Sequence, residues 1–243
     1  MSDLSPGIDL SSASVKLGGR LVLEGISLRL SEARIGILGR NGSGKTTLLR
    51  LIAGLIAPDQ GVVRVDGVDP FTDRKAALGA LGILFQNPDH QILFPTVEEE
   101  LAFGLLQQGL SQGEATLRAS ALLAAEGRGR WAKVSVSTLS QGQRHYLCLL
   151  AVLLMGPRTI LLDEPLAGLD LPTQARLARR FAALPQRVVT ITHDPAVLEG
   201  ADRVIWLEAG RVVADGPPAS VIPDFTAEMA RIGARDADAD LSG

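Results

Sequence analysis

The sequence contains a single cysteine, Cys148, among its 243 residues. One thiol excludes an internal disulfide and makes a cysteine-ligated zinc cluster implausible. Stability must therefore come from a packed hydrophobic core, and a chain of this length can bury one as a single domain. Cys148 itself lies in an apolar helical pattern, where we expect it to be a core residue.

Long hydrophobic runs are also missing. The longest, Tyr146–Met155, has ten residues, whereas an α-helix needs about 20 to cross a bilayer. The first ten residues, MSDLSPGIDL, contain neither the basic nor the apolar segment of a signal peptide. These patterns predict a soluble, cytoplasmic protein. The positive mean hydropathy of +0.21 is nevertheless compatible with a membrane-bound partner.

Positive charge is not in excess either. The chain has 24 Lys and Arg against 27 Asp and Glu, a formal net charge of −3. Such a balance provides no electrostatic footprint for a nucleic acid. We therefore expect no nucleic-acid partner.

Strand and helix patterns alternate over most of the chain. Residues 8–30 predict two or three strands, and ARIGILG, GVVRVDG, LGILFQ, RTILLDEP and RVVTITH predict further ones. Helices are expected from Gly44 to near Pro58 and over PTQARLARRFAAL, and a hairpin over ADRVIWLEAGRVVADG. This alternation is typical of an α/β fold with a mostly parallel sheet.

Two segments depart from that alternation. Proline-interrupted loops and amphipathic helices after Gln86 predict a helical lobe over about 87–150, inserted into a single domain spanning 1–243. Residues from about 222 to 243 are expected to form a short C-terminal tail, acidic and disordered beyond Asp236.

The segment GRNGSGKT matches the pattern G-x-x-x-x-G-K-[ST] in full and lies between a predicted strand and a predicted helix. Its glycines let the backbone bend around phosphates with N–H groups pointing inward. Lys45 is expected to reach the β- and γ-phosphates, and the Thr46 hydroxyl to ligate Mg²⁺. An ordinary glycine turn with a solvated lysine is the alternative. The predicted nucleotide-binding residues are Gly39, Arg40, Asn41, Gly42, Ser43, Gly44, Lys45, Thr46 and Thr47.

Polar residues follow three of the predicted strands, where open α/β sheets bind their ligands. Asp163 is expected to hold Mg²⁺ through water, and Glu164 to take a proton from the attacking water. Gln86 is placed to contact both the metal and the water, and His193 ends another strand. Taken alone, Gln86 is more often a surface amide and His193 a satisfied surface or core residue. Their catalytic roles therefore depend on convergence at one nucleotide.

A second phosphate-binding feature lies far downstream, in TLSQGQRHYLCLLAVLLM from Thr138 to Met155. Small polar residues stand where an apolar helix should begin. Helix starts of this kind expose backbone N–H groups and favour an anion. His145 within this stretch, and His90 upstream, have no strand-end placement, so we expect them to be structural or solvated.

Taken together, these residues resemble the ATP-binding cassette of ABC transporters, over about residues 8–216. The order is GRNGSGKT, Gln86, LSQGQ, ILLDEP, AGLD and then TH at 192–193, and LSQGQ is a one-residue variant of the family signature LSGGQ. The resemblance implies a P-loop NTPase fold with an antiparallel β subdomain, ATP hydrolysis, and a head-to-tail dimer, most simply a homodimer. The signature residues that would bind the γ-phosphate held by the partner chain are Ser140, Gly142 and Gln143. Asp170, in AGLD, matches the position that communicates between the two sites.

One departure from the family concerns the base. The family usually stacks adenine on an aromatic residue shortly before the second strand. The matching segment here, SVKLGGR, offers Val15, Lys16 and Leu17 instead. The resemblance therefore implies an apolar, weaker contact with adenine and poor base discrimination.

The segment FQNPDHQILFPTVEEELAFG, residues 85–104, resembles the ATPases of energy-coupling-factor (ECF) importers. That resemblance implies a transmembrane coupling subunit, a substrate-binding membrane subunit, and a peripheral position on the cytoplasmic face of a bacterial membrane. The residues expected to line the groove for the coupling helix, unless they form a plain lobe core, are Phe85, Ile92, Leu93, Phe94 and Phe103. With only residues 217–243 after the last hairpin, the chain looks most like a biotin-module ATPase. Cobalt or nickel uptake is the alternative, and a non-transport ABC protein is the alternative class.

Overall fold

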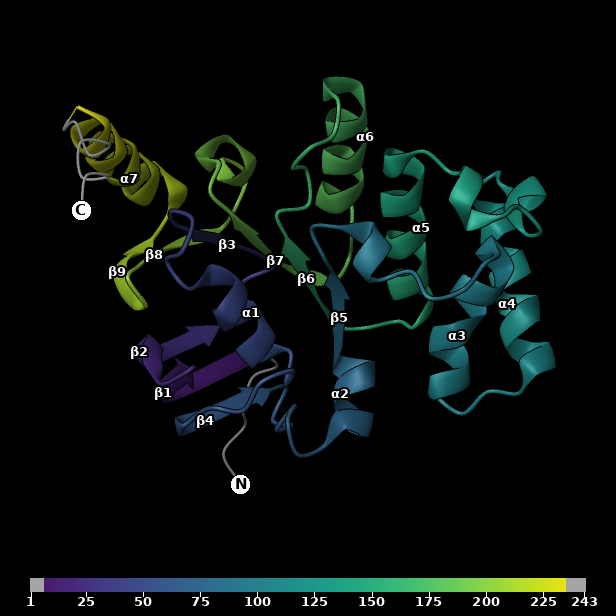
Figure 1. Ribbon diagram of the computed structural model, residues 1–243, viewed down its shortest axis with the longest axis horizontal. Helices are drawn as coiled ribbons and strands as arrows, with labels where there is room; N and C mark the ends of the chain where they lie inside the picture. The colour runs from purple at the N-terminus through teal and green to yellow at the C-terminus, as the bar shows by residue number, and fades with distance from the viewer. Residues whose placement is uncertain (1–6, 235–243) are drawn as a thin grey trace.

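Two β-sheets meet at the centre of the molecule in the computed structural model, which describes residues 7–234 (Figure 1). One sheet has the strand order β5-β6-β7-β3-β8-β9, and the other the order β2-β1-β4. The strands are β1 (Ile8–Leu17), β2 (Arg20–Leu30), β3 (Arg34–Leu38), β4 (Gln60–Val65), β5 (Leu81–Leu84), β6 (Thr159–Asp163), β7 (Arg187–Thr192), β8 (Arg203–Glu208) and β9 (Arg211–Gly216).

Helices cover and extend the sheets. They are α1 (Lys45–Ile52), α2 (Arg74–Ala80), α3 (Val97–Gln107), α4 (Gln112–Ala125), α5 (Gln141–Leu154), α6 (Leu171–Ala182) and α7 (Pro218–Gly233), with short 3₁₀ helices η1 (Pro88–His90), η2 (Gly129–Trp131), η3 (Val136–Thr138) and η4 (Pro195–Leu198). Over residues 7–234, no helix combines the length and the hydrophobicity of a membrane span.

The larger sheet is parallel from β5 to β8, and only β9 pairs antiparallel, with β8. Its central strands carry continuous apolar runs because both faces are covered. Ile160, Leu161 and Leu162 of β6, for example, are almost completely buried. The predicted α/β class with a mostly parallel sheet is confirmed. Since parallel strands point the same way, β3, β6 and β7 end at one edge.

The smaller sheet is antiparallel, as the family resemblance implied, and packs against the larger one through α1. Leu23 of β2, Leu48 and Leu49 of α1, and Ile37 of β3 share one hydrophobic core. Each such side chain stabilises the fold by about 1.5–3 kcal/mol when fully buried. This core fixes the start of α1 against the end of β3. The helix predicted from Gly44 to near Pro58 ends earlier, at Ile52.

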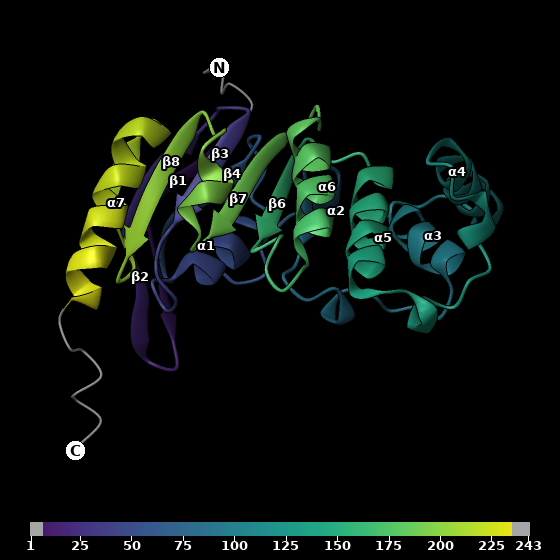
Figure 2. The ribbon, with the colours of Figure 1, turned by 90° about the horizontal axis from the view of Figure 1, so that it is seen from above.

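A helical lobe extends from the sheet edge at β5, and it contains α3, α4 and the short helices η2 and η3 (Figure 2). Helix α5 belongs to both parts of the molecule. Its Cys148 and Leu149 pack with the sheet and α6, whereas Leu147 and Leu150 pack with α3 and α4. The helix therefore connects the lobe to the strands, and the expected lobe limit at residue 150 falls inside it.

The C-terminal segment contains a helix that the sequence interpretation missed. The described part of the tail expected from about residue 222 is helical, because α7 continues through it to Gly233. Two prolines at its start and Pro223 within it hide the helical pattern. Tertiary packing compensates: Phe225 meets Trp206 of β8 edge-on, with ring centroids 5.5 Å apart. The disorder expected beyond Asp236 falls outside the described residues.

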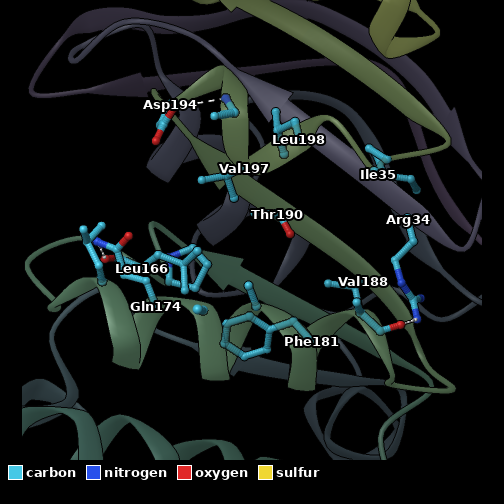
Figure 3. Close-up of a pocket in the computed structure, with 18 residues that line it drawn as sticks. Arg34, Ile35, Leu166, Gln174, Phe181, Val188, Thr190, Asp194, Val197 and Leu198 are labelled. Atoms are coloured by element: carbon cyan, nitrogen blue, oxygen red, sulfur yellow. Dashed lines mark hydrogen bonds between the residues drawn. The ribbon is translucent and has the colours of Figure 1, made fainter.

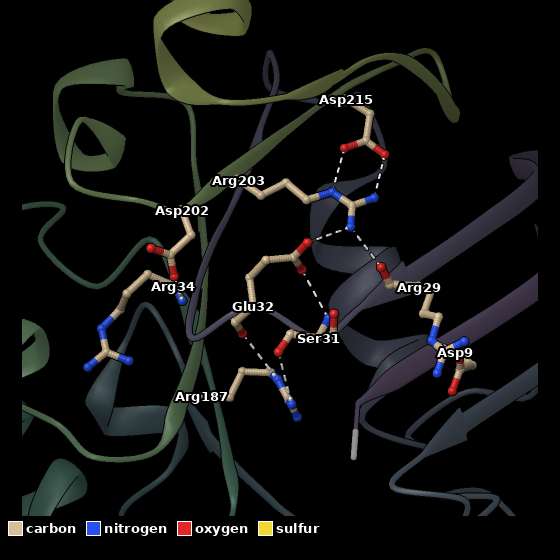
Figure 4. A network of polar contacts seen from close by, with 9 residues as sticks. All are labelled: Asp9, Arg29, Ser31, Glu32, Arg34, Arg187, Asp202, Arg203 and Asp215. Carbon is tan, nitrogen blue, oxygen red and sulfur yellow. Dashed lines mark hydrogen bonds and ion pairs between the residues drawn. The ribbon is translucent and has the colours of Figure 1, made fainter. Parts of the chain in front are cut away.

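A polar network connects the strands at the edge of the larger sheet where β8 begins, opposite the edge at which β3, β6 and β7 end (Figure 4). Arg203 of β8 donates two hydrogen bonds of 2.6 Å to Asp215 of β9. The same guanidinium donates to the Glu32 carboxylate at 3.0 Å and to the Arg29 carbonyl at 2.8 Å. One arginine therefore links the hairpin β8–β9 to the connection between β2 and β3.

Candidate nucleotide-binding site

The loop between β3 and α1 has the shape of a phosphate cradle. Gly44 caps α1 with a φ of 104°, a left-handed conformation that glycine adopts without strain. Gly39 has no room for a side chain, because a Cβ there would lie 2.2 Å from the Leu207 carbonyl oxygen. The glycines at these two positions are therefore required by backbone conformation and by close packing, respectively.

Lys45 lies buried at the centre of the cradle. Its Nζ donates to the carbonyl oxygens of Gly39 at 2.7 Å and Arg40 at 2.9 Å. Burial lowers the pKa of this ammonium, while the charges of Glu164 and Asp163 oppose the decrease. A poorly solvated cation with only carbonyl partners suits a phosphate oxygen, which would restore a full opposing charge.

Asp163 and Thr46 have the properties of magnesium ligands. Asp163 ends β6 and is 6% exposed, and its Oδ1 is buried without a hydrogen-bond partner. Burial, followed by the charge of Glu164, raises the pKa of this carboxyl, whereas Arg50, Lys45 and the Thr46 hydroxyl oppose the rise. A bound cation would stabilise the charged form. Among residues 7–234 no group of three or more acidic, His or Cys side chains is placed to hold a metal ion by itself. A few protein oxygens completed by water and phosphate are the usual surroundings of Mg²⁺.

Glu164 is oriented by two residues at the end of β7. Thr192 donates its hydroxyl to Oε2 at 3.0 Å, and His193 Nδ1 lies 2.9 Å from Oε1. The backbone of Glu164 has a φ of 46°, unusual for a residue with a side chain, and its N–H donates to the Ile191 carbonyl at 2.8 Å. Strained backbone of this kind concentrates at functional sites. The arrangement aims a carboxylate into the cradle with few alternative conformations.

One cavity of about 350 Å³ gathers part of the predicted site, whereas Gly39, Arg40, Ser43 and Asp163 do not line it. It is lined by Val22, Asn41, Gly42, Gly44, Lys45, Thr46, Thr47, Gln86, Glu164 and His193. The structure therefore brings Gln86 and His193, which are far apart in the sequence, to the same cradle. The requirement that both converge on the phosphate loop is met.

The signature residues do not line this cavity. Ser140 caps α5, accepting from the Gln143 N–H at 3.3 Å, while Gln143 Oε1 accepts from the Ser140 N–H at 2.8 Å. Ser140 and Gln143 are exposed, and α5 lies across β6 from α1 in both views (Figures 1 and 2). The start of α5 is thus separate from the phosphate loop of its own chain.

The expected adenine contacts need a correction. Val15 is 1% exposed and belongs to the core between the sheets, so it is not available to a base. The apolar residue that lines the cavity is Val22 of β2, and Leu17 and Leu21 at the tip of the same hairpin are exposed. Sequence reasoning missed Val22 because it sought the base contact before the second strand, whereas Val22 lies within β2. The lining of the cavity therefore includes a charged side chain, Lys45, and an apolar one, Val22.

A larger hollow of about 570 Å³ lies elsewhere, between α6 and η4 on the face of the sheet (Figure 3). Its walls are mainly apolar, with Phe181 and Leu166 on one side and Val197 and Leu198 on the other. None of the residues of the phosphate loop lines it. Size alone therefore does not identify the nucleotide site.

The parallel sheet, the phosphate loop at the end of β3 and the acids at the end of β6 define the protein as a P-loop nucleotide hydrolase. A family model described as ABC transporter matches residues 23–167. The biotin transport ATP-binding protein BioM of Rhodobacter capsulatus is 54% identical over 230 residues, covering 93% of this chain and 98% of that protein.

Solved structures give the same assignment. The cbiO1 protein of Clostridium perfringens, described as part of the ABC transporter complex cbiONQ, superposes with a TM-score of 0.76 at 26% identity, covering 94% of both chains. The ATP-binding cassette MJ0796, solved as a dimer with ADP and phosphate, gives a TM-score of 0.73 at 27% identity. The match covers 87% of this chain and 98% of that one. The chain belongs to the ABC transporter family, as an ATP-binding and ATP-hydrolysing subunit.

Proposed function

We propose that this chain is the ATPase of an ECF-type importer that takes up biotin. The single observation that carries the proposal is the 54% identity to a biotin transport ATPase over nearly the whole of both chains. No residue described above contacts the transported solute, so the solute is inferred from that similarity. The protein would act at the cytoplasmic face of a bacterial membrane, with a transmembrane coupling subunit and a substrate-binding membrane subunit.

Within the site, Lys45 and the loop from Gly39 to Thr47 bind the ATP phosphates. Thr46, Gln86 and Asp163 are the residues that would hold Mg²⁺, which neutralises phosphate charge when bound. Glu164 accepts the proton of the attacking water. His193 and Thr192 keep its carboxylate oriented toward the cavity.

The signature completes the site of a second copy. Ser140, Gly142 and Gln143 lie at the start of α5 and do not line their own cradle, and a helix start favours an anion. In a head-to-tail homodimer they bind the γ-phosphate held by the partner. ATP then stabilises the dimer, and hydrolysis removes the bridging charge, which makes a two-state switch. Asp170, which caps α6 by accepting from the Thr173 N–H at 2.8 Å, lies in the loop expected to connect the two sites.

The expected groove for the coupling helix contains partly exposed aromatic residues. The rings of Phe94 and Phe103 are 5.1 Å apart, and Leu93 is 66% exposed. Glu100, 6% exposed, accepts hydrogen bonds from the N–H groups of Leu93 and Phe94 at 2.8 and 2.9 Å. This buried carboxylate fixes the loop that presents Leu93. Of the five expected residues, Ile92 instead packs into the core, so the remaining four favour a helix-in-groove contact.

Uptake measurements test the proposal. A strain lacking this ATPase is complemented with the wild-type chain or with Lys45→Ala, and uptake of labelled biotin, Co²⁺ and Ni²⁺ is measured. Biotin uptake that requires the wild-type chain supports the proposal. Restored Co²⁺ or Ni²⁺ uptake without biotin uptake contradicts the solute, and restoration of neither, with the membrane subunits present, contradicts the importer role.

A further inference from the structure

His145, in the first turns of α5, has no exposed surface, and each of its ring nitrogens faces a backbone carbonyl. Nδ1 is 3.2 Å from the Gln141 oxygen, and Nε2 is 3.1 Å from the Gln86 oxygen. The Gln141 carbonyl lies one turn back in the same helix, where the backbone N–H of His145 is its regular partner. The Gln86 carbonyl lies outside the helices and strands, and no backbone N–H of residues 7–234 donates to it.

This difference between the two carbonyls determines which nitrogen donates. A neutral imidazole carries one N–H and one acceptor nitrogen. With the hydrogen on Nε2, His145 donates to the Gln86 carbonyl. The other tautomer would give a second donor to the Gln141 carbonyl and leave Gln86 without one. The Nε2–H form is favoured, because it supplies a donor to the carbonyl that no backbone N–H of residues 7–234 reaches, whereas the Gln141 carbonyl already has its helical donor.

Neighbouring side chains hold the same segment. Arg144 pairs with Asp89 at 2.9 Å, and Cys148 Sγ is 4.0 Å from the Pro88 carbonyl. On the other side, Gln91 accepts from the Phe85 N–H at 3.3 Å. These contacts restrain the residues on either side of Gln86. The contact of His145 is the one that reaches Gln86 itself.

We propose that His145 is a positioning residue, which fixes Gln86 in its own nucleotide cavity relative to the start of α5. Ser140 begins that helix five residues earlier, so the hydrogen bond connects the signature, which serves the partner's nucleotide, to Gln86, which serves its own. A helix moves as a rigid element, and displacement at one end therefore changes the place of Gln86. The inference rests on the proposed roles of Gln86 and of the signature.

Three substitutions of His145 separate positioning from packing. Leucine at this position removes both hydrogen bonds. The amide nitrogen of glutamine reaches about as far as Nε2, whereas that of asparagine reaches only about as far as Nδ1. His145→Leu and His145→Asn should lower the kcat of ATP hydrolysis roughly 10-fold, with KM for ATP changed less than about twofold. His145→Gln should recover most of the turnover.

The matched control is Leu150→Ala, which creates a packing defect on the lobe side of the same helix, away from Gln86. It should lower the melting temperature while leaving kcat of the folded protein nearly unchanged. Equal loss of turnover in all three His145 variants, or a loss that follows the melting temperature as in the control, would overturn the inference.

A double-mutant cycle with Gln86→Ala distinguishes the failure of this inference from that of the proposed site. If His145 acts through Gln86, His145→Leu should cost little further turnover in the Gln86→Ala background. Full additivity, with Gln86→Ala itself impaired, overturns the role of His145 alone. Normal turnover of Gln86→Ala removes the proposed role of Gln86, and the inference with it.

Discussion

His193 Nδ1 lies 2.9 Å from Oε1 of Glu164, at the ends of two adjacent parallel strands. The contact orients a carboxylate whose other oxygen is held by Thr192. Glu164 thus faces the phosphate loop with both oxygens fixed by neighbours at the end of β7. This geometry suits a general base, which needs a set direction toward the water it activates.

Glu164→Gln should therefore lower ATP turnover roughly 10²- to 10⁴-fold, the usual contribution of a general base. ATP binding should persist, because the amide keeps the shape of the side chain and the phosphate loop is unchanged. Single-turnover hydrolysis and nucleotide binding are measured on the same preparation, and gel filtration should detect an ATP-bound dimer. Hydrolysis near the wild-type rate would remove Glu164 from this role.

The signature can be tested in trans by mixing two inactive subunits. Ser140→Arg places a cation where the partner's γ-phosphate should dock, so its homodimer should bind ATP without hydrolysing it. Mixed with Glu164→Gln, it should recover activity, because one composite site then combines an intact cradle and base with an intact signature. The other composite site combines the substituted base with the substituted signature, so at most about half of the sites in such a heterodimer are complete. Absence of activity at every mixing ratio would speak against a trans arrangement.

A matched control isolates the capping effect of that substitution. Ser111 caps α4 with the same reciprocal pair of hydrogen bonds, through Glu114, as Ser140 makes through Gln143. Loss of such a cap costs about 0.5–2 kcal/mol. Ser111→Arg should therefore lower stability comparably while retaining hydrolysis. If it abolishes hydrolysis as well, the Ser140→Arg result reflects helix destabilisation.

Base selectivity should be weak. The cavity is lined by the apolar Val22 and by no aromatic residue, and stacking on an aromatic ring is worth roughly 1–3 kcal/mol for a base. ATP and GTP should accordingly compete within about an order of magnitude. Val22→Ala should weaken the binding of ATP and of GTP to a similar extent. Strong preference for ATP in a competition assay would mean that another residue recognises adenine.

The Arg203 network should stabilise the fold without affecting the nucleotide site. Arg203→Ala removes hydrogen bonds to Asp215, Glu32 and the Arg29 carbonyl, and we expect a loss of about 1–3 kcal/mol in the free energy of unfolding. Arg231→Ala is the control. It breaks an exposed pair within one helix turn, with Glu228, and should change stability by less than about 0.5 kcal/mol. Urea denaturation measures both, and equal effects would contradict the importance of the network.

The same network predicts a pH dependence. Burial alone would raise the pKa of the Glu32 carboxyl, but hydrogen bonds from the backbone and from Arg203 outweigh it and keep the pKa below its ordinary value of 4.5. A carboxyl with a depressed pKa contributes stability that is present above the ordinary value and is lost as pH falls through the folded-state pKa. Below pH 4.5 the wild-type protein should therefore lose part of its advantage over Arg203→Ala. A constant difference down to acid unfolding would contradict this linkage.

Cys148 should report unfolding. Burial, followed by the charges of Glu100 and Asp89, raises the pKa of its thiol to about 12. The thiolate is the reactive form, so the folded protein should resist thiol reagents. Modification should appear together with loss of helical circular dichroism in a urea titration. Rapid modification of the native protein would show that the middle of α5 opens more readily than its packing suggests.

The sequence by itself predicted the elements whose cause is local. The phosphate loop could be recognised because its glycines, Lys45 and Thr46 are adjacent in the chain, and the buried strands because their apolar runs are continuous. The capped start of α5 was also evident from Ser140 and Gln143, three residues apart. Sequence identity to known transport ATPases then carried the family assignment.

The tertiary structure decided what depends on distant residues. It placed Val15 in the core rather than beside the adenine base. It also stabilised α7 through Trp206, despite the prolines that obscure the helical pattern. It also joined Gln86 to His145, 59 residues later. Strand-end position made convergence at one nucleotide expected. Side-chain direction, however, follows from packing across the sheet, which no local pattern encodes. Local conformational preference therefore determined the cradle, while burial and long-range hydrogen bonding determined how the residues around it are aimed.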